Sequence, residues 1–284
     1  MIVWADDGTG NPLAHGLVDV ETSRVSVLDR GLIVGDGVFE TLKVVAGRPF
    51  ALTRHLRRLS DSARALAIDL PSEHELRAAI AATLDANQAG IGDISRLRIT
   101  VTHGIGDPGD PYAGEARPLL LVTVVPQNLW PAGSVVALSE FTRNEHSALA
   151  GVKSTSYAEN AVALRAARRR GADEALLLNT AGHLCEGTGS NIVVALDGDL
   201  VTPPLTSGCL AGITRELALE WCDITARAIT GSEISDGTEA FLTSSTRDLH
   251  PISNLAGRDL PVPGPLTAQA IADWRAHESL GVDP

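Results

Sequence analysis

Two residues of this 284-residue chain have side chains suited to carbonyl chemistry. Lys153 lies in a loop of small and apolar residues just ahead of an expected helix, and Glu186 opens the turn Glu186-Gly-Thr-Gly-Ser190. A lysine amine attacks an aldehyde only when it is neutral, and a partly buried site can favour that form. A carboxylate can hold the nitrogen of a heteroaromatic ring protonated. Taken singly, a loop lysine is more often a solvated charge and a turn carboxylate more often an exposed cap.

Other residues have the chemistry of a phosphate site. Ile213 and Thr214 open an expected helix after a glycine, where free amides and the helix dipole can bind an anion, although an ordinary helix start is the commoner explanation. Ser245 offers a hydroxyl, and Arg58 offers a guanidinium fork for phosphate oxygens. An amine for an aldehyde, an acid for a pyridine nitrogen and a phosphate cradle together describe pyridoxal phosphate (PLP).

The elements that must position these residues form an α/β pattern with one break. Hydrophobic periodicity and turn residues predict strands at 38–45, 96–102, 119–125, 135–138, 174–178, 191–195 and 240–244. They predict helices at 55–68, 72–87 and 157–170, one that begins at 212, and one at 266–276. The Pro/Gly-rich segment 127–133 is the expected linker between an N-terminal domain, 1–126, and a C-terminal domain, 134–284.

The composition limits the classes of partner and compartment. A formal net charge of −12 argues against nucleic acid or an anionic membrane surface as a partner, which leaves small molecules. Three cysteines, none in a Cys-x-x-Cys pair, and the lack of a signal-like or membrane-spanning apolar run predict a soluble cytoplasmic protein. No zinc-binding spacing or nucleotide-binding loop is present in the sequence, so no metal is expected.

The ordered set of motifs resembles the fold-type IV PLP enzymes, the class IV aminotransferase group. This group includes branched-chain and D-amino-acid aminotransferases and aminodeoxychorismate lyase. The motifs are 28–41, 55–59, Lys153, 172–176, 186–191, 210–214 and 243–246, which together span most of the chain. The resemblance implies a small N-terminal α/β domain and a larger C-terminal α/β domain with PLP in the cleft between them. It also implies a homodimer, in which the loop 104–114 of one subunit completes the site of the other.

Residue by residue, the resemblance gives Lys153 the roles of Schiff-base lysine and general acid/base, and makes Glu186 the partner of the pyridine nitrogen. Arg58, the Ile213 and Thr214 amides and the Ser245 hydroxyl become the phosphate ligands.

Two reactions are compatible with this set. The first hypothesis is aminodeoxychorismate lyase, which forms 4-aminobenzoate and pyruvate for folate synthesis, because 38–41 and 172–176 look lyase-like. The second is an aminotransferase, D-amino-acid type before branched-chain type, since the branched-chain enzymes carry glycine at the position of Thr41 and an aromatic residue near Ala158. A non-catalytic binder would not need Lys153, Glu186 and a phosphate cradle together.

The substrate-binding residues follow less directly from the resemblance. The expected substrate contacts are Phe39, Thr41, Arg98 and His103. His103 stands where D-amino-acid enzymes place an arginine for the substrate carboxylate, so that ligand is left open. The candidates for it are Arg98, Arg143 and Arg247.

Overall fold

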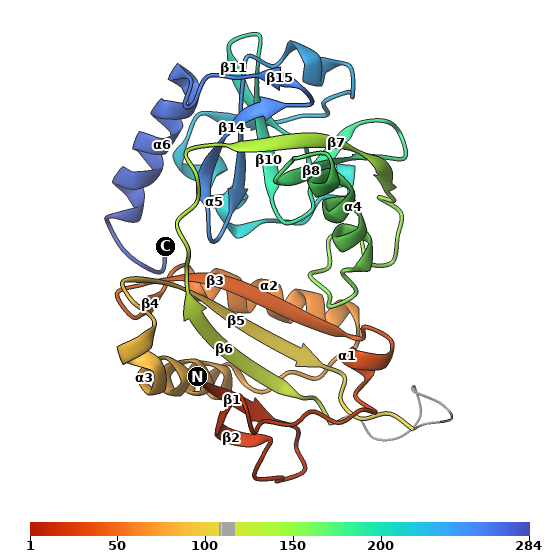
Figure 1. The fold of residues 1–284 in the computed structure, drawn as a ribbon, viewed down its shortest axis with the longest axis vertical. Coiled ribbons are helices and arrows are strands. Elements are labelled where there is room, and N and C mark those ends of the chain that lie inside the picture. Colours follow the sequence, from red (N-terminus) through yellow and green to blue (C-terminus); the bar gives the residue numbers. More distant parts are fainter. Residues whose placement is uncertain (108, 110–116) are drawn as a thin grey trace. The chain divides into compact units, whose positions relative to one another are not determined.

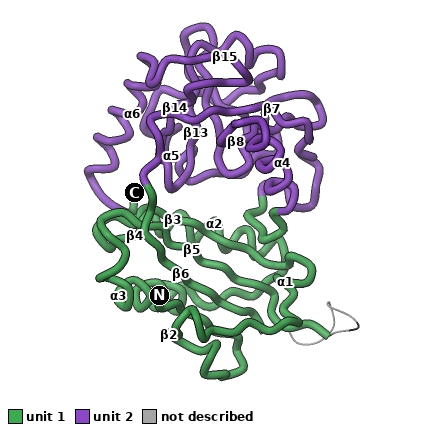
Figure 2. Tube along the Cα trace, viewed as in Figure 1, with its two compact units in different colours: residues 1–128, 152–157, 283 green, residues 129–151, 158–282, 284 purple. Residues whose placement is uncertain are grey.

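The structure is a computed structural model that describes residues 1–107, 109 and 117–284. It contains two compact units, one of residues 1–128, 152–157 and 283 and one of residues 129–151, 158–282 and 284 (Figure 2). The segment 152–157, which carries Lys153, therefore belongs to the first unit. None of the helices in the described ranges is long and apolar enough to span a membrane.

The first unit is built on a six-stranded antiparallel sheet in the order β2-β1-β6-β5-β3-β4 (Figure 1). Its strands are β1 (Ile2–Asp6), β2 (His15–Asp19), β3 (Gly37–Val45), β4 (Arg48–Pro49), β5 (Ile94–Thr102) and β6 (Leu120–Pro126). Its helices are α1 (Arg30–Ile33), α2 (Leu52–Ala65), α3 (Glu73–Asn87) and the 3-10 turn η1 (Gln88–Gly90). Strands β3 and β5 are the longest of this sheet, and β3 is the element that positions the candidate site.

Alternation along β3 sends Val38, Leu42 and Val44 into the core of the first unit, where they join apolar residues of α2 and α3. Helix α3 begins where the sequence predicts, because Ser72 and Glu75 form the expected capping box. Helix α2 begins three residues earlier than expected and ends at Ala65 instead of 68.

The second unit is built on a nine-stranded mixed sheet in the order β12-β11-β10-β13-β14-β7-β8-β9, with β15 paired to β14. Its strands are β7 (Ser134–Arg143), β8 (Glu174–Asn179), β9 (Leu184–Gly187), β10 (Asn191–Leu196), β11 (Asp199–Thr202), β12 (Ile224–Ala226), β13 (Glu239–Ser244), β14 (Asp248–Leu255) and β15 (Arg258–Asp259). Its helices are α4 (Ala158–Arg169), α5 (Ile213–Trp221) and α6 (Pro265–Glu278), with 3-10 turns η2 (Leu205–Ser207) and η3 (Glu233–Asp236). Apolar residues of β8, β10, β13 and β14 form its main core.

The architecture confirms the mixed α/β class, with each expected strand and helix present. Strand β7 runs to Arg143 instead of ending at Leu138, because a register shift against β8 between Leu138 and Thr142 lets the strand continue past its polar residues. The sequence did not predict the eight-residue strand β14 or the shorter strands β1, β2, β4, β9, β11, β12 and β15. Most of the loop 104–114, expected to reach a partner subunit, lies outside the described residues.

Candidate functional site

The segment that contains Lys153 lies beside the start of β3 in the first unit. The Lys153 carbonyl accepts a hydrogen bond from the Phe39 N–H (3.0 Å), and the Lys153 N–H donates to Ser62 Oγ (3.2 Å). Thr155 continues the contact, with its N–H donating to the Gly37 carbonyl (2.7 Å). The Lys153 Nζ lies 4.6 Å from the centre of the Phe39 ring. The backbone of this segment is thereby fixed to a sheet strand, and its amine is held against an aromatic surface.

The Phe39 ring gathers further side chains of the expected substrate set. The Arg98 guanidinium carbon lies 3.8 Å from the ring centre, and the Tyr157 ring meets it edge-on with centres 5.4 Å apart. Thr41 pairs with Arg98 across β3 and β5. Phe39, Thr41, Arg98 and Lys153 therefore form one cluster, which we call the Phe39 cluster.

His103 is engaged differently. Its Nδ1 lies 2.9 Å from Asp36 Oδ2, and its backbone N–H donates to the Asp36 carbonyl (3.0 Å). The pair joins the end of β5 to the residue that precedes β3, so His103 has a structural partner in this unit.

Arg58 lies on α2 and is bound by a buried acid that the sequence did not single out. Its Nε donates to Glu40 Oε1 (2.8 Å) and its NH2 group to Glu40 Oε2 (2.6 Å), while His55 Nδ1 lies 2.6 Å from Oε2. Because two of the guanidinium nitrogens are held by one carboxylate, the plane of the Arg58 fork is fixed. An acid on the core-facing side of β3, between Val38 and Leu42, is the signal that could have revealed Glu40.

The charges in this triad follow from burial and pairing. Burial alone would raise the pKa of Glu40, but Arg58 and His55 outweigh it and hold the pKa of Glu40 well below its usual value. Burial lowers the pKa of His55, against the opposing attraction of Glu40. We therefore assign a carboxylate to Glu40 and a neutral ring to His55, which donates its Nδ1–H.

Glu186 ends up at a fixed position in the second unit, on β9. Its Oε2 accepts a hydrogen bond from the Leu210 N–H (2.9 Å), and its Oε1 lies 3.4 Å from the Arg143 NH2 group. Arg143 also donates to Asn160 Oδ1 (2.9 Å). The Glu186 carboxylate is buried, since the residue is 8% exposed. Arg143 and the Leu210 N–H therefore stabilise the charge of a carboxylate that has little contact with water.

The expected phosphate ligands of the second unit lie at a helix start and in a turn. Helix α5 begins at Ile213 after Gly212, which provides no side-chain cap, so its first amides are available to an anion. Ser245 lies in the turn between β13 and β14. Within the described ranges, the buried hydroxyls of Thr243 and Ser244, next to it, have no hydrogen-bond partner. Buried hydroxyls without partners are unusual in proteins and fit a site built for a polar ligand.

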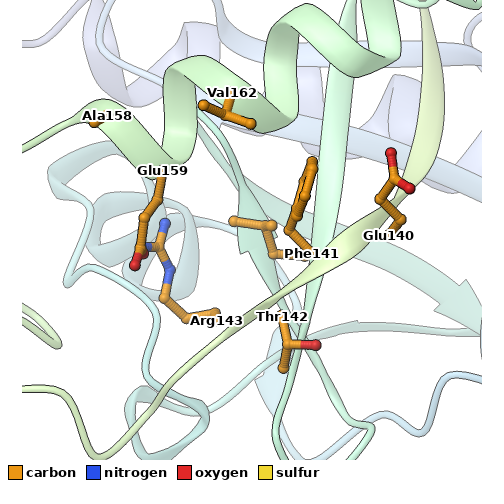
Figure 3. A pocket seen from close by; sticks show the side chains of 8 residues that line it. Glu140, Phe141, Thr142, Arg143, Ala158, Glu159 and Val162 are labelled. Atoms are coloured by element: carbon orange, nitrogen blue, oxygen red, sulfur yellow. The ribbon is translucent and has the colours of Figure 1, made fainter.

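A pocket of about 550 Å³ in the second unit is lined by residues of β7, α4 and β8 (Figure 3). Arg143 and Glu159 lie together at one side of it, with 3.5 Å between NH1 and Oε2, and Phe141, Val162 and Leu177 supply apolar surface. Arg143 therefore contacts both the pocket and Glu186.

The donor set fits the chemistry of PLP. Taken separately, the first unit contains an amine and a fixed arginine, and the second contains a buried carboxylate, the amides of a helix start and hydroxyls. Each group matches one part of the cofactor: aldehyde, phosphate or ring nitrogen. Arg143 and Arg247, two of the three candidates for a substrate carboxylate, each pair with an acid of the second unit, Glu186 and Glu174 respectively.

Comparison with known proteins places the chain among similar sequences and folds. The family model described as amino-transferase class IV matches residues 37–255. The chain is 31% identical to a D-alanine aminotransferase of Bacillus licheniformis over 88% of this chain and 90% of the relative. It is 30% identical to a bifunctional aminodeoxychorismate lyase / D-amino acid transaminase of Mycobacterium tuberculosis, over 82% of this chain and 86% of the relative. The structure of a branched-chain aminotransferase from Thermoproteus uzoniensis superposes with a TM-score of 0.86 at 31% identity, covering 97% of this chain and 93% of that one.

Proposed function

Because the chain belongs to the class IV aminotransferase family, we propose that it is a PLP-dependent aminotransferase that moves an amino group between an amino acid and a 2-oxo acid. The observation that carries this proposal is the Lys153 amine held against Phe39 by a backbone that is hydrogen-bonded to β3. A lysine at such a position is restrained enough to act on a bound carbonyl compound.

Enzymes of this class use PLP, which when bound supplies an electron sink for negative charge at the amine-bearing carbon of the substrate. We assign to Lys153 the cofactor aldehyde and the proton transfer at that carbon. Glu186 would hold the ring nitrogen, with Arg143 and the Leu210 N–H fixing its carboxylate. Arg58, the amides of Ile213 and Thr214, and the Ser245 hydroxyl hold the phosphate.

The substrate contacts follow from the Phe39 cluster. Arg98 is the best candidate for the substrate carboxylate, because it lies on the Phe39 ring that also carries Lys153, whereas Arg143 and Arg247 pair with acids. Phe39 and Thr41 then flank the substrate side chain, and His103 with Asp36 is the remaining substrate candidate.

A homodimer is part of the proposal and is tested by light scattering of the purified protein.

The lyase reaction is the second candidate. The sequence alone favoured it, but the Bacillus licheniformis and Thermoproteus uzoniensis relatives, each 31% identical, are named as aminotransferases, and the lyase name occurs together with a transaminase name in the Mycobacterium tuberculosis relative. The 30% identity of that relative to this chain supports the lyase reaction as the second candidate.

One experiment separates these possibilities. The PLP-loaded protein is incubated with 2-oxoglutarate and either D-alanine or L-leucine, and separately with aminodeoxychorismate without an amino acceptor. Glutamate formed from one of the amino acids supports the aminotransferase and shows which configuration it accepts. Catalytic release of 4-aminobenzoate and pyruvate in equal amounts, without amino transfer, supports the lyase instead.

A further inference from the structure

Glu174, the first residue of β8, is a buried acid with no part in the proposed chemistry. It is 1% exposed, yet it carries a carboxylate that polar groups approach from two separate turns. Its Oε1 accepts from the Thr188 N–H (3.0 Å) and from the Thr188 hydroxyl, and from its neighbour's N–H at Ala175 (3.2 Å). Its Oε2 accepts from the Ser190 hydroxyl (3.2 Å) and from the Arg247 NH2 group (3.1 Å).

The first of these turns contains Thr188 and Ser190 and comes directly after Glu186 in the chain. The turn is closed by the Gly187 N–H, which donates to the Ser190 carbonyl (2.8 Å). It is also tight, since a Cβ added at Gly187 would lie 2.5 Å from Ser190 Oγ and 3.3 Å from Glu174 Cδ. Three donors of this turn therefore converge on one carboxylate, which fixes the backbone immediately after Glu186.

A second set of contacts leads from the same turn to the Glu186 side chain. The Thr188 carbonyl accepts from Asn160 Nδ2 (2.6 Å), and Asn160 Oδ1 accepts from Arg143, whose NH2 group lies 3.4 Å from Glu186 Oε1. Displacing Thr188 would therefore move both the backbone of Glu186 and the cation that faces its carboxylate.

The other turn joins β13 to β14 and contains Ser245. Arg247 at its end is held by Glu174, and its guanidinium lies 4.5 Å over the Trp130 ring. The Trp130 indole N–H in turn donates to the Thr246 carbonyl (2.9 Å). Loss of the negative charge of Glu174 would leave the largely buried Arg247 cation without its carboxylate.

We propose that Glu174 is a positioning residue that fixes, through a single buried carboxylate, both the turn carrying Glu186 and the turn carrying Ser245. It thereby couples the end of the site that holds the ring nitrogen to the end that holds the phosphate. This inference rests on the proposed function, because it assigns those two turns to the cofactor.

The test is the Glu174→Gln variant, which keeps the size of the side chain and removes its charge. We expect the dissociation constant for PLP, measured by titrating the apo-protein, to rise roughly tenfold or more, since several charge-assisted hydrogen bonds are weakened. We also expect the visible absorption band of the lysine-bound cofactor to shift, because the acid beside the ring nitrogen moves.

Glu239→Gln is the matched control. Glu239 is also a buried acid of the second unit, but it accepts from the Leu266 and Thr267 amides at the start of α6. This variant should lower thermal stability while leaving PLP affinity within about twofold and the spectrum unchanged. If Glu174→Gln fails to fold, Thr188→Val, which removes one hydroxyl donor at constant shape, should raise the dissociation constant in the same direction.

The outcomes are separable. A wild-type protein that forms no lysine-bound PLP refutes the proposed function and this inference with it. A wild-type protein that binds PLP, with Glu174→Gln unchanged in affinity and spectrum or changed only as much as Glu239→Gln, refutes the positioning role and leaves the function standing.

Discussion

Replacing Glu40 by glutamine removes the anion at the centre of a fully buried triad. Glu40 is 0% exposed, and its two oxygens take three contacts of 2.6–2.8 Å from Arg58 and His55. Glutamine keeps the shape but carries no charge and offers an NH2 group where an acceptor is needed. The variant leaves the buried Arg58 cation without a counter-ion.

The cost follows from this arrangement. Removing one partner of a buried ion pair typically costs about 3–5 kcal/mol, because the remaining charge stays desolvated. At roughly 2–4 °C per kcal/mol, a loss of about 3 kcal/mol lowers the melting temperature by about 6–12 °C. Glu40 is held as an anion, so this contribution is fully present above the ordinary carboxyl pKa and is lost only in acid, as pH falls toward its depressed pKa.

The assay is thermal unfolding of the apo-protein at pH 7, followed by circular dichroism. Glu75→Gln is the control, because Glu75 is an exposed acid of the capping box and its replacement should lower the melting temperature much less than Glu40→Gln does. The double variant Glu40→Gln/Arg58→Met should recover part of the loss, since both charges are then absent. A melting temperature for Glu40→Gln within about 2 °C of wild type would refute the argument from the buried pair.

Three other predictions concern different parts of the chain. Burial and the neighbouring Arg247 lower the pKa of His250, and Asp173 opposes this shift. The unfolded state therefore takes up the proton first, so the free energy of unfolding should fall as pH drops below about 6.5. Urea titrations should show a weaker pH dependence for His250→Gln. Burial raises the pKa of Cys222 to about 11, which leaves a thiolate fraction of about 10⁻⁴ at pH 7. A thiol reagent should therefore modify Cys222 far more slowly in the native protein than in urea. Gly212→Ala should weaken PLP binding, because the added Cβ at the start of α5 would lie 2.0 Å from Asn191 Oδ1. Gly90→Ala, with open space around its Cβ, should leave PLP binding unchanged. Equal PLP affinities for the two variants would exclude a phosphate site at the start of α5.

The parts of the fold that could be predicted from the sequence are those with strong local signals. The Ser72 and Glu75 capping box defines the start of α3, and the β-branched run of β3 defines a strand, because both depend on neighbours along the chain. Strands such as β9 were missed because four residues containing a cysteine, an acid and a glycine carry no strand pattern of their own. Pairing with β8 makes β9 a strand, and that pairing is a property of the fold.

The same distinction applies to the candidate site. Lys153 and Glu186 could be selected from the order of motifs, but the acid that each arginine contacts could not. Arg143 meets Glu186 because β7 and β9 both flank β8, and Arg58 meets Glu40 because α2 packs on β3. Such pairs depend on long-range packing, so sequence spacing gave no ranking of the arginines.

The most direct test of the central claim is to identify where the protein holds its cofactor. The PLP-loaded protein is reduced with borohydride, digested and analysed by peptide mass spectrometry, with Lys43, a buried lysine of the first unit, as an internal comparison. We expect a stoichiometric pyridoxyl adduct on Lys153, absent from Lys153→Ala, and an unmodified Lys43. An adduct on another lysine, or none at all, would contradict this expectation.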